Sequence, residues 1–257
     1  MLNLVGLGLR GVKSLTIEQF EVLKASDIVY FETYTSISPQ GTIRELERIL
    51  AKKVLAAERE FVESQEEIIR LSAYQNVSIV ITGDPLSATT HNQLRADTMG
   101  AGIDVQTFEN ASIISVVPGK IGLFPYRMGP PVSVPFPEDN FLPKSVLEKI
   151  GANLSQNQHP ILLLDLKEGR TMFSHEALET ILQMEGRYKL GVINEEIMVF
   201  SLSRVSQVGE RLIFDTVKNI ISARFAEFPS TLVIPAKLNH NEEEFAEKFT
   251  KKCSYFR

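Results

Sequence analysis

The sequence predicts an α/β protein of two domains, the first built on a parallel sheet and the second on a mixed sheet. Strands alternate with amphipathic helices through the first part of the chain, as they do around parallel sheets. Seven of the twelve prolines then lie between Pro118 and Pro143, a density that excludes a long helix or a central strand. Beyond them, two strands follow each other through a short link that contains glycine, which is typical of an antiparallel hairpin. We therefore place the domains at residues 1–117 and 118–257.

Apolar runs predict four strands in the first domain, and periodic apolar positions between them predict helices. The run VSIVIT at 77–82 is apolar, which is typical of a strand buried on both faces of a parallel sheet. Two pairs, Thr42 with Glu45 and Ser64 with Glu67, have the spacing of capping boxes ahead of helices. The predicted strands are 2–7, 27–32, 77–82 and 103–109, and the predicted helices follow Thr16, Thr42, Ser64 and residue 90 or so.

The same patterns predict the elements of the second domain. Its predicted helices lie near 143–155 and 174–186, after 217, and in the charged stretch at 241–252. Its predicted strands are 160–167, 197–203, 210–217 and 231–238, of which the second and third form the hairpin.

Composition and charge exclude several classes of protein. The net charge of −5 is confined to residues 1–117, which hold ten Lys and Arg against fifteen Asp and Glu; the remaining residues hold seventeen of each. Because no basic stripe is present, non-specific nucleic-acid binding is not expected. No apolar run approaches the roughly 20 residues that span a bilayer, and no signal peptide is expected. The single Cys253 fits a cytoplasmic location, and the scattered histidines predict no metal site.

Three glycines directly after the first strand leave two interpretations open. Gly6, Gly8 and Gly11 spell G-x-G-x-x-G, and Glu32 ends the next strand, which is the layout of a dinucleotide-binding site. However, the helix begins only after Thr16, so its amino-terminal end is displaced from the third glycine. A nicotinamide oxidoreductase is therefore the less favoured interpretation, and a tight turn at the strand end is the other.

A second glycine motif, TGDPLSATTH at 82–91, follows the apolar strand at 77–82. Open α/β sheets bind ligands at the carboxyl ends of such strands. Gly83 lets the backbone turn closely around a ligand, and Pro85 stiffens the turn. Asp84 either accepts hydrogen bonds from a ligand or caps the turn, and spacing alone does not choose between them.

Several of these motifs together resemble the diphthine synthase family, within the tetrapyrrole-methylase-like group of S-adenosylmethionine methyltransferases. They are VGLGL at 5–9, ETYTS at 32–36, GDPLSATTH at 83–91, NASII at 110–114, PEDNFLPKS at 137–145, LLLDLK at 162–167 and PAKL at 235–238. The resemblance covers nearly the whole chain. It implies two α/β domains with S-adenosyl-L-methionine in the cleft between them, and S-adenosyl-L-homocysteine as the product.

The resemblance also implies a set of residues that contact the cofactor, largely through the main chain. They are Leu9, Asp84, Ser87, Ser112, Ile113, Leu164, Val205 and Ser230. It identifies no metal and no catalytic residue. We consider Tyr34, Thr35 and Ser36 as hydroxyls on the substrate side of the site.

The implied reaction is methylation of an amine on the modified histidine of translation elongation factor 2, in diphthamide biosynthesis. The enzyme is then expected to be a homodimer that binds this factor, and neither nucleic acid nor a membrane. The alternatives are a tetrapyrrole methylase that acts on carbon, the nicotinamide oxidoreductase above, and a binding module without catalysis.

Overall fold

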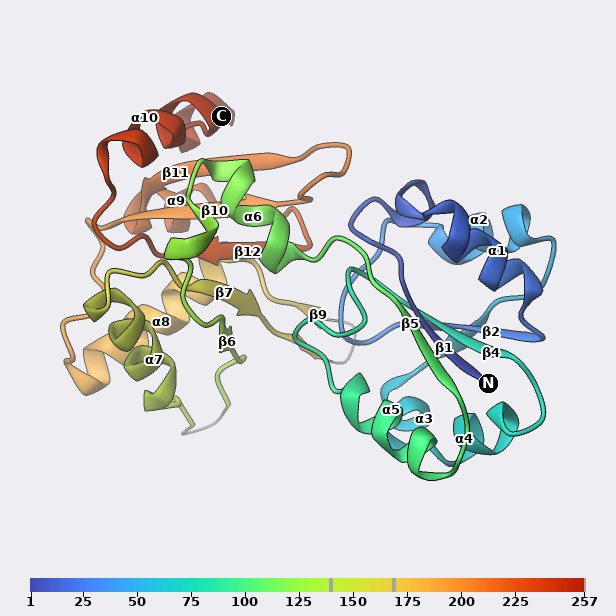
Figure 1. Ribbon diagram of the computed structural model, residues 1–257. Coiled ribbons are helices and arrows are strands. Elements are labelled where there is room, and N and C mark those ends of the chain that lie inside the picture. The colour runs from blue at the N-terminus through green and yellow to red at the C-terminus, as the bar shows by residue number, and fades with distance from the viewer. Residues whose placement is uncertain (139–140, 168–169, 257) are drawn as a thin grey trace. The chain divides into compact units, whose positions relative to one another are not determined.

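The computed structural model describes residues 1–138, 141–167 and 170–256, so residues 139–140 of the PEDNFLPKS motif lie outside the described residues (Figure 1). The chain divides into two compact units, Met1–Ile113 and Ile114–Arg257. Residue 117, where we place the end of the first domain, lies inside helix α6 (Ile113–Ile121), which also contains Pro118.

The first unit contains a sheet of five parallel strands in the order β3-β2-β4-β1-β5. This confirms the predicted parallel sheet. The strands are β1 (Leu2–Gly6), β2 (Ile28–Glu32), β3 (Leu55–Ala57), β4 (Val77–Ile81) and β5 (Val105–Phe108). The sequence did not predict β3, an edge strand of three residues that is too short for a hydrophobic pattern.

Helices cover both faces of this sheet, α1 and α2 on one and α3, α4 and α5 on the other (Figure 1). Four of the five residues of β4 are apolar because the strand is buried on both faces. Val77, Ile79 and Ile81 pack on the side of α3 to α5, whereas Val80 packs against α1 and α2. The helices are α1 (Ile17–Ala25), α2 (Thr42–Leu50), α3 (Arg59–Ser64), α4 (Glu66–Ser72) and α5 (His91–Gly100), and a 3-10 turn covers Gly11–Ser14.

The helix starts differ in part from the prediction. Thr16 caps α1 as expected, because its hydroxyl accepts a hydrogen bond from the Gln19 amide at 3.1 Å. Both predicted capping boxes are wrong. Thr42 is the first residue of α2, whose N-cap is Gly41, and Ser64 is the last residue of α3. The chain enters both α2 and α4 through a residue with positive φ, which shifts the start of each helix relative to the Ser/Thr-x-x-Glu pattern.

The second unit contains a mixed sheet in the order β11-β10-β12-β7-β6, as predicted. Only β6 and β7 run parallel, and β10 and β11 form the predicted hairpin. The proline-rich stretch contributes the short edge strand β6, consistent with the exclusion of a central strand there. The strands are β6 (Val132–Val134), β7 (Ile161–Leu164), β10 (Met198–Ser203), β11 (Arg211–Thr216) and β12 (Ser230–Val233), with a separate pair β8 (Leu166–Lys167) and β9 (Arg170–Thr171).

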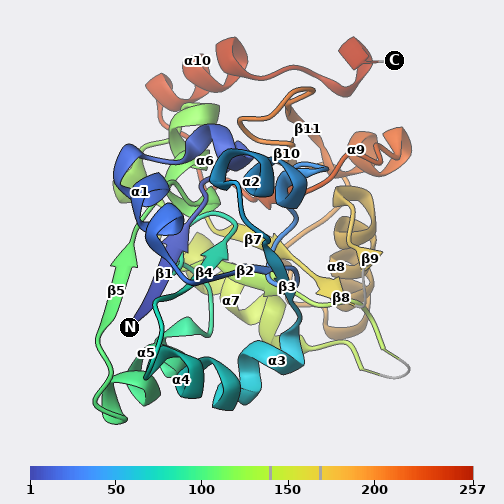
Figure 2. The same cartoon turned by 90° about the vertical axis from the view of Figure 1, so that its right-hand side faces the viewer.

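The main core of the second unit lies between its sheet and the helices α7, α8 and α9 (Figures 1 and 2). The helices are α7 (Lys144–Ser155), α8 (Ser174–Tyr188), α9 (Val217–Ala223) and α10 (His240–Phe249), and 3-10 turns cover Pro125–Arg127 and Cys253–Phe256. Within the described ranges, no helix has both the length and the apolar character needed to cross a membrane.

A buried ion cluster attaches α10 to the rest of this unit. Glu242 is fully buried and pairs with Arg127 and with the Nε2 atom of His159, at 3.2 Å in the second case. The Ala236 amide donates to Nδ1 of His159 at 2.9 Å, so the neutral ring carries its proton on Nε2. Burial lowers the pKa of His159 below its ordinary value, which favours this neutral form.

The end of the chain lies along the outer edge of β11. The Phe214 amide donates to the Lys251 carbonyl at 3.0 Å, and the Lys251 amide donates to the Leu212 carbonyl at 2.9 Å. Asp215 then accepts a hydrogen bond from the Cys253 amide at 2.9 Å. Burial raises the pKa of Asp215, but this bond and those from Thr216 and Asn219 outweigh it and lower the pKa overall.

Candidate functional site

The loops after β1 and β4 are joined by their main chains at two glycines. The Gly8 amide donates to the Gly83 carbonyl at 2.9 Å, and the Gly83 amide donates back to the Gly8 carbonyl at 3.0 Å. Gly6 lies against the same loop, since a Cβ atom on it would be 2.8 Å from the Gly83 carbonyl oxygen and 2.9 Å from Cδ of Pro85. Gly8 and Gly83 both have positive φ. The first and second glycines of the G-x-G-x-x-G motif are therefore needed for close packing of two loops.

The carboxylate of Asp84 fixes the geometry of the loop after β4 and connects it to the loop after β5. Its Oδ1 atom accepts hydrogen bonds from the Leu86 amide and the Ser87 hydroxyl, both at 3.0 Å. Its Oδ2 atom accepts one from the Asn110 amide at 3.1 Å. Both carboxylate oxygens are thus used within the protein, and of the two roles left open by the sequence the structure shows the turn-capping one.

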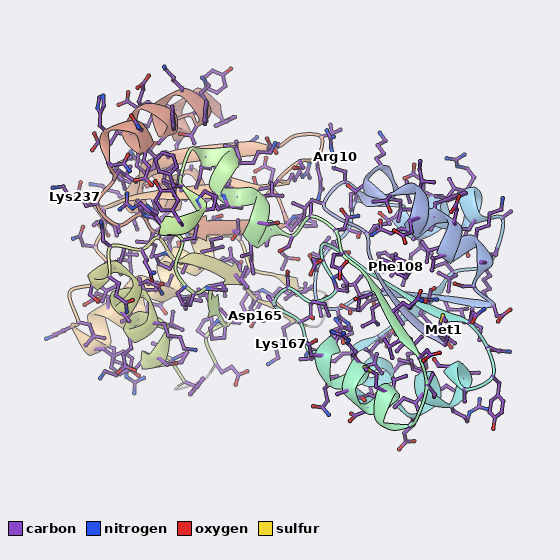
Figure 3. All side chains as sticks on the ribbon, viewed as in Figure 1. Met1, Arg10, Phe108, Asp165, Lys167 and Lys237 are labelled. Atoms are coloured by element: carbon purple, nitrogen blue, oxygen red, sulfur yellow. The ribbon has the colours of Figure 1, made fainter. Side chains whose placement is uncertain are left out.

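Asn110 joins all three loops and is not among the site residues predicted from the sequence. Its side-chain amide donates to the Gly6 carbonyl and the Ser14 carbonyl, both at 3.0 Å, and to Oε1 of Gln19 at 3.1 Å. Gln19 in turn donates to the Phe108 carbonyl at 3.2 Å. Figure 3 labels Phe108 at the end of β5 and Arg10 in the loop after β1. The NASII motif contained the residue, but its partners lie far away in the sequence.

The first unit therefore brings together five of the predicted cofactor residues at the carboxyl ends of adjacent strands. Leu9 follows β1, Asp84 and Ser87 follow β4, and Ser112 and Ile113 follow β5. Gly83 is buried but has room beside its main chain, because a Cβ atom on it would meet only the Ala111 carbonyl oxygen, at 3.9 Å. A ligand bound largely by main-chain groups, as expected for S-adenosylmethionine, fits such a set of glycine-containing loops.

The second unit brings the other three predicted residues together where neighbouring strands of its sheet end or begin. Leu164 ends β7, Val205 follows β10 by two residues, and Ser230 begins β12, which lies between these strands. Because β12 runs antiparallel to both neighbours, its first residue lies beside the last residues of those strands. The Ser230 hydroxyl donates to the Glu227 carbonyl at 2.6 Å, and the Val205 side chain is buried.

Asp165, directly after Leu164, has a structural role in this unit. Its Oδ2 atom accepts a hydrogen bond from the Phe136 amide at 2.9 Å, and its carbonyl accepts one from the Met172 amide at 3.0 Å. Figure 3 labels it at the end of β7, near the start of β8. The carboxylate thus links the residue after β7 to the segment that follows β6.

Glu32 and His91 form a buried pair that connects the ETYTS and GDPLSATTH motifs. The Glu32 carboxylate contacts Nε2 of His91, and both side chains are almost fully buried. Glu32 also accepts a hydrogen bond from the Thr35 amide at 3.0 Å and one from the Thr35 hydroxyl. Burial, reinforced by the nearby Glu32 carboxylate, raises the pKa of Tyr34 to about 12. Glu32 is therefore engaged inside the protein, which argues against the ribose contact that a nicotinamide enzyme requires.

A family model described as Tetrapyrrole (Corrin/Porphyrin) Methylases matches residues 1–220. The chain therefore belongs to this family of methylases. A diphthine synthase of Thermoplasma acidophilum is 39% identical over 254 residues, which cover 99% of this chain and 97% of that protein. A diphthine synthase of Methanocaldococcus jannaschii is 32% identical, over 95% of this chain and 96% of that protein.

Solved structures agree with these relatives. A crystal structure of diphthine synthase superimposes with a TM-score of 0.88 at 27% identity, over 97% of this chain and 95% of that chain. Within the methylase family, the chain is thus placed among the diphthine synthases, the S-adenosylmethionine-dependent methyltransferases of diphthamide biosynthesis.

Proposed function

We propose that this chain transfers the sulfonium methyl group of S-adenosyl-L-methionine to the amine of the modified histidine of translation elongation factor 2. The observation that carries the proposal is the junction of three loops at the ends of β1, β4 and β5, held by Asp84 and Asn110. This junction lies within the residues that the methylase family model matches. The relatives named diphthine synthase, which align over nearly the whole chain, support the choice of acceptor.

The reaction is an in-line displacement at the methyl carbon. A bond forms between the amine nitrogen and the methyl carbon, the carbon–sulfur bond breaks, and its electron pair stays on sulfur, which becomes a neutral thioether. The nitrogen then carries the positive charge until a proton leaves to water. Because the sulfonium supplies an activated methyl group, the protein's task is to align the reacting atoms and exclude water.

The residues of the chain are proposed to act mainly through the main chain. In the first unit, Leu9, Ser87, Ser112 and Ile113 lie in the loops that would contact the cofactor, and Asp84 holds these loops in place. In the second unit, the corresponding set would be Leu164, Val205 and Ser230. At Ser230 the hydroxyl is already bonded to the Glu227 carbonyl, so a cofactor contact there would use the backbone.

A transfer assay tests the proposal directly. The protein is incubated with S-adenosylmethionine labelled in the methyl group and with elongation factor that carries the unmethylated side chain. We expect label on the modified histidine, retained after denaturation of the factor. Absence of label on that factor, despite binding of S-adenosylhomocysteine measured by calorimetry, would refute the assignment.

A porphyrinoid acceptor is the alternative that the family's description suggests. Methylation at carbon rather than nitrogen, with label on the porphyrinoid and none on the factor, would favour it. We further propose that the protein acts as a homodimer, in the cytoplasm where the translation factor occurs. Light scattering coupled to gel filtration measures the oligomeric state.

A further inference from the structure

An open groove lies at the carboxyl end of β2, in the first unit. Its volume is about 460 Å³, and it is formed by the segment that follows β2 and by the first turn of α2. Such a volume suits a small polar group with its connecting atoms. The lining residues are Phe31, Thr33, Ser36 to Gly41, and Thr42 to Arg44.

The groove adjoins two of the loops that form the candidate cofactor site. The Ser38 hydroxyl is 2.5 Å from the Thr82 hydroxyl, and Thr82 directly precedes Gly83 in the loop after β4. On another side, a Cβ atom on Gly11 would lie 3.3 Å from Oγ1 of Thr42. Because β2 and β4 are neighbours in the sheet, a group in the groove would lie beside the loops after β1 and β4.

The charge of the groove is opposite to that of its surroundings. Among the described residues that line it, Arg44 is the only charged one, and its side chain is exposed. Among the residues that the structure describes, no carboxylate lies within ion-pair distance of Arg44. Yet residues 1–113 hold ten Lys and Arg against fifteen Asp and Glu, a net charge of −5. The guanidinium of Arg44 therefore makes this groove attractive to an anionic group.

The polar side chains around Arg44 can supply further donors. The exposed amide of Gln40 and the half-buried hydroxyl of Ser36 both line the groove. A guanidinium binds a carboxylate through two parallel hydrogen bonds, which fixes the orientation of the carboxylate as well as its position.

We propose that this groove is the acceptor subsite, where Arg44 binds the carboxylate of the side chain that is methylated. The inference rests on the proposed function, because the acceptor that the family resemblance implies is an aminocarboxypropyl group on the histidine, in which the amine and the carboxylate share one carbon. Binding the carboxylate fixes the direction of the amine on the adjacent carbon and leaves its nitrogen free to react. The subsite would therefore select an amino acid group over an amine without a carboxylate, and it would orient the nitrogen for displacement.

Substitution of Arg44 tests the subsite, with Arg48 as the matched control. Arg48 lies on the same helix, is exposed and does not line the groove. For Arg44→Gln we expect the KM for the elongation factor to rise by about tenfold to a hundredfold, as for loss of a charge-assisted hydrogen bond. The Kd for S-adenosylhomocysteine and the melting temperature should stay at wild-type values, Arg44→Lys should be intermediate, and Arg48→Gln should match the wild type.

A second acceptor separates carboxylate binding from general docking of the factor. The second acceptor is elongation factor whose side-chain carboxylate has been converted to a methyl ester. With this acceptor we expect the KM of the wild type to rise to the value of Arg44→Gln, and the KM of the variant to stay unchanged. The subsite is overturned if Arg44→Gln keeps the wild-type KM, if Arg48→Gln is equally impaired, or if the KM of Arg44→Gln still exceeds that of the wild type when both act on the ester. If the wild type itself transfers no label to the factor, the proposed function fails and the subsite fails with it.

Discussion

Gly6→Ala tests whether close packing of the loops after β1 and β4 is required for cofactor binding. Gly6 does not have a positive φ, so alanine fits its backbone and the effect of the substitution is steric. The new Cβ atom would lie 2.8 Å from the Gly83 carbonyl oxygen, 2.9 Å from Cδ of Pro85 and 3.0 Å from Cβ of Asn110. Ordinary contacts would require the loops to retreat by about 0.5 Å on three sides.

The three contacts set the expected magnitude. Adding a methylene to a packed interior costs about 1–3 kcal/mol, and the neighbours of Gly6 are main chain or short braced side chains that cannot rotate away. We therefore expect a loss of about 2–3 kcal/mol in the free energy of unfolding, from the upper part of that range. Since the same loops would contact the cofactor, the Kd for S-adenosylhomocysteine should rise by about tenfold or more.

Urea titration and calorimetry measure the two effects, and Gly100→Ala is the control. Gly100 ends α5 in the same unit, lacks a positive φ, and has no heavy atom within 4 Å of an added Cβ. Its substitution should change the unfolding free energy by less than about 1 kcal/mol and leave binding unchanged. The reasoning is refuted if Gly6→Ala binds S-adenosylhomocysteine as the wild type does and unfolds like Gly100→Ala.

Three further changes have defined outcomes. Asp84→Ala leaves two loop amides and a hydroxyl without their acceptor, so we expect a loss of about 2–4 kcal/mol in unfolding free energy. We also expect weaker binding of S-adenosylhomocysteine by calorimetry, and wild-type affinity would contradict this. Glu32→Gln weakens the buried pair with His91 and should cost about 1–3 kcal/mol, measured by urea titration, and an unchanged midpoint would count against that pair. Because the folded-state pKa of His159 lies below its ordinary value of 6.5, the unfolded state binds a proton first on acidification, and stability should fall as the pH drops below about 6.5. The difference in stability between wild type and His159→Gln should shrink over that range; a difference that is flat from pH 7 to 5 would exclude this effect.

The sequence predicted the elements whose stability depends on local pattern. The run at 77–82 was recognised as a strand because β4 is buried on both faces, which forces an apolar side chain at nearly every position. β3 was not predicted, because three residues at the edge of a sheet are too few to show a hydrophobic pattern. The capping boxes failed at Thr42 and Ser64 because the backbone before α2 and α4 adopts positive φ, a property that the Ser/Thr-x-x-Glu spacing does not encode.

The candidate site was predictable only where its residues are close in sequence. Asp84 stands out because it follows a strand and a glycine, and its bond to Ser87 is local. The pairing of Glu32 with His91 and the contacts of Asn110 depend on loops that the parallel order of the strands brings together. By its type and position Glu32 could contact a ribose, an interpretation that the late start of the first helix already disfavours, and its buried partner His91 argues against that role as well.

Both edges of the second sheet are closed to further strands. At one edge the main chain of Lys251 bonds to the Phe214 amide and the Leu212 carbonyl of β11, and at the other the three-residue strand β6 is flanked by Pro131 and Pro135. Such devices prevent edge-to-edge aggregation. Assembly of copies through this unit would therefore have to use side-chain surfaces, and removal of residues 251–257 would uncover a strand edge and make the protein prone to precipitate.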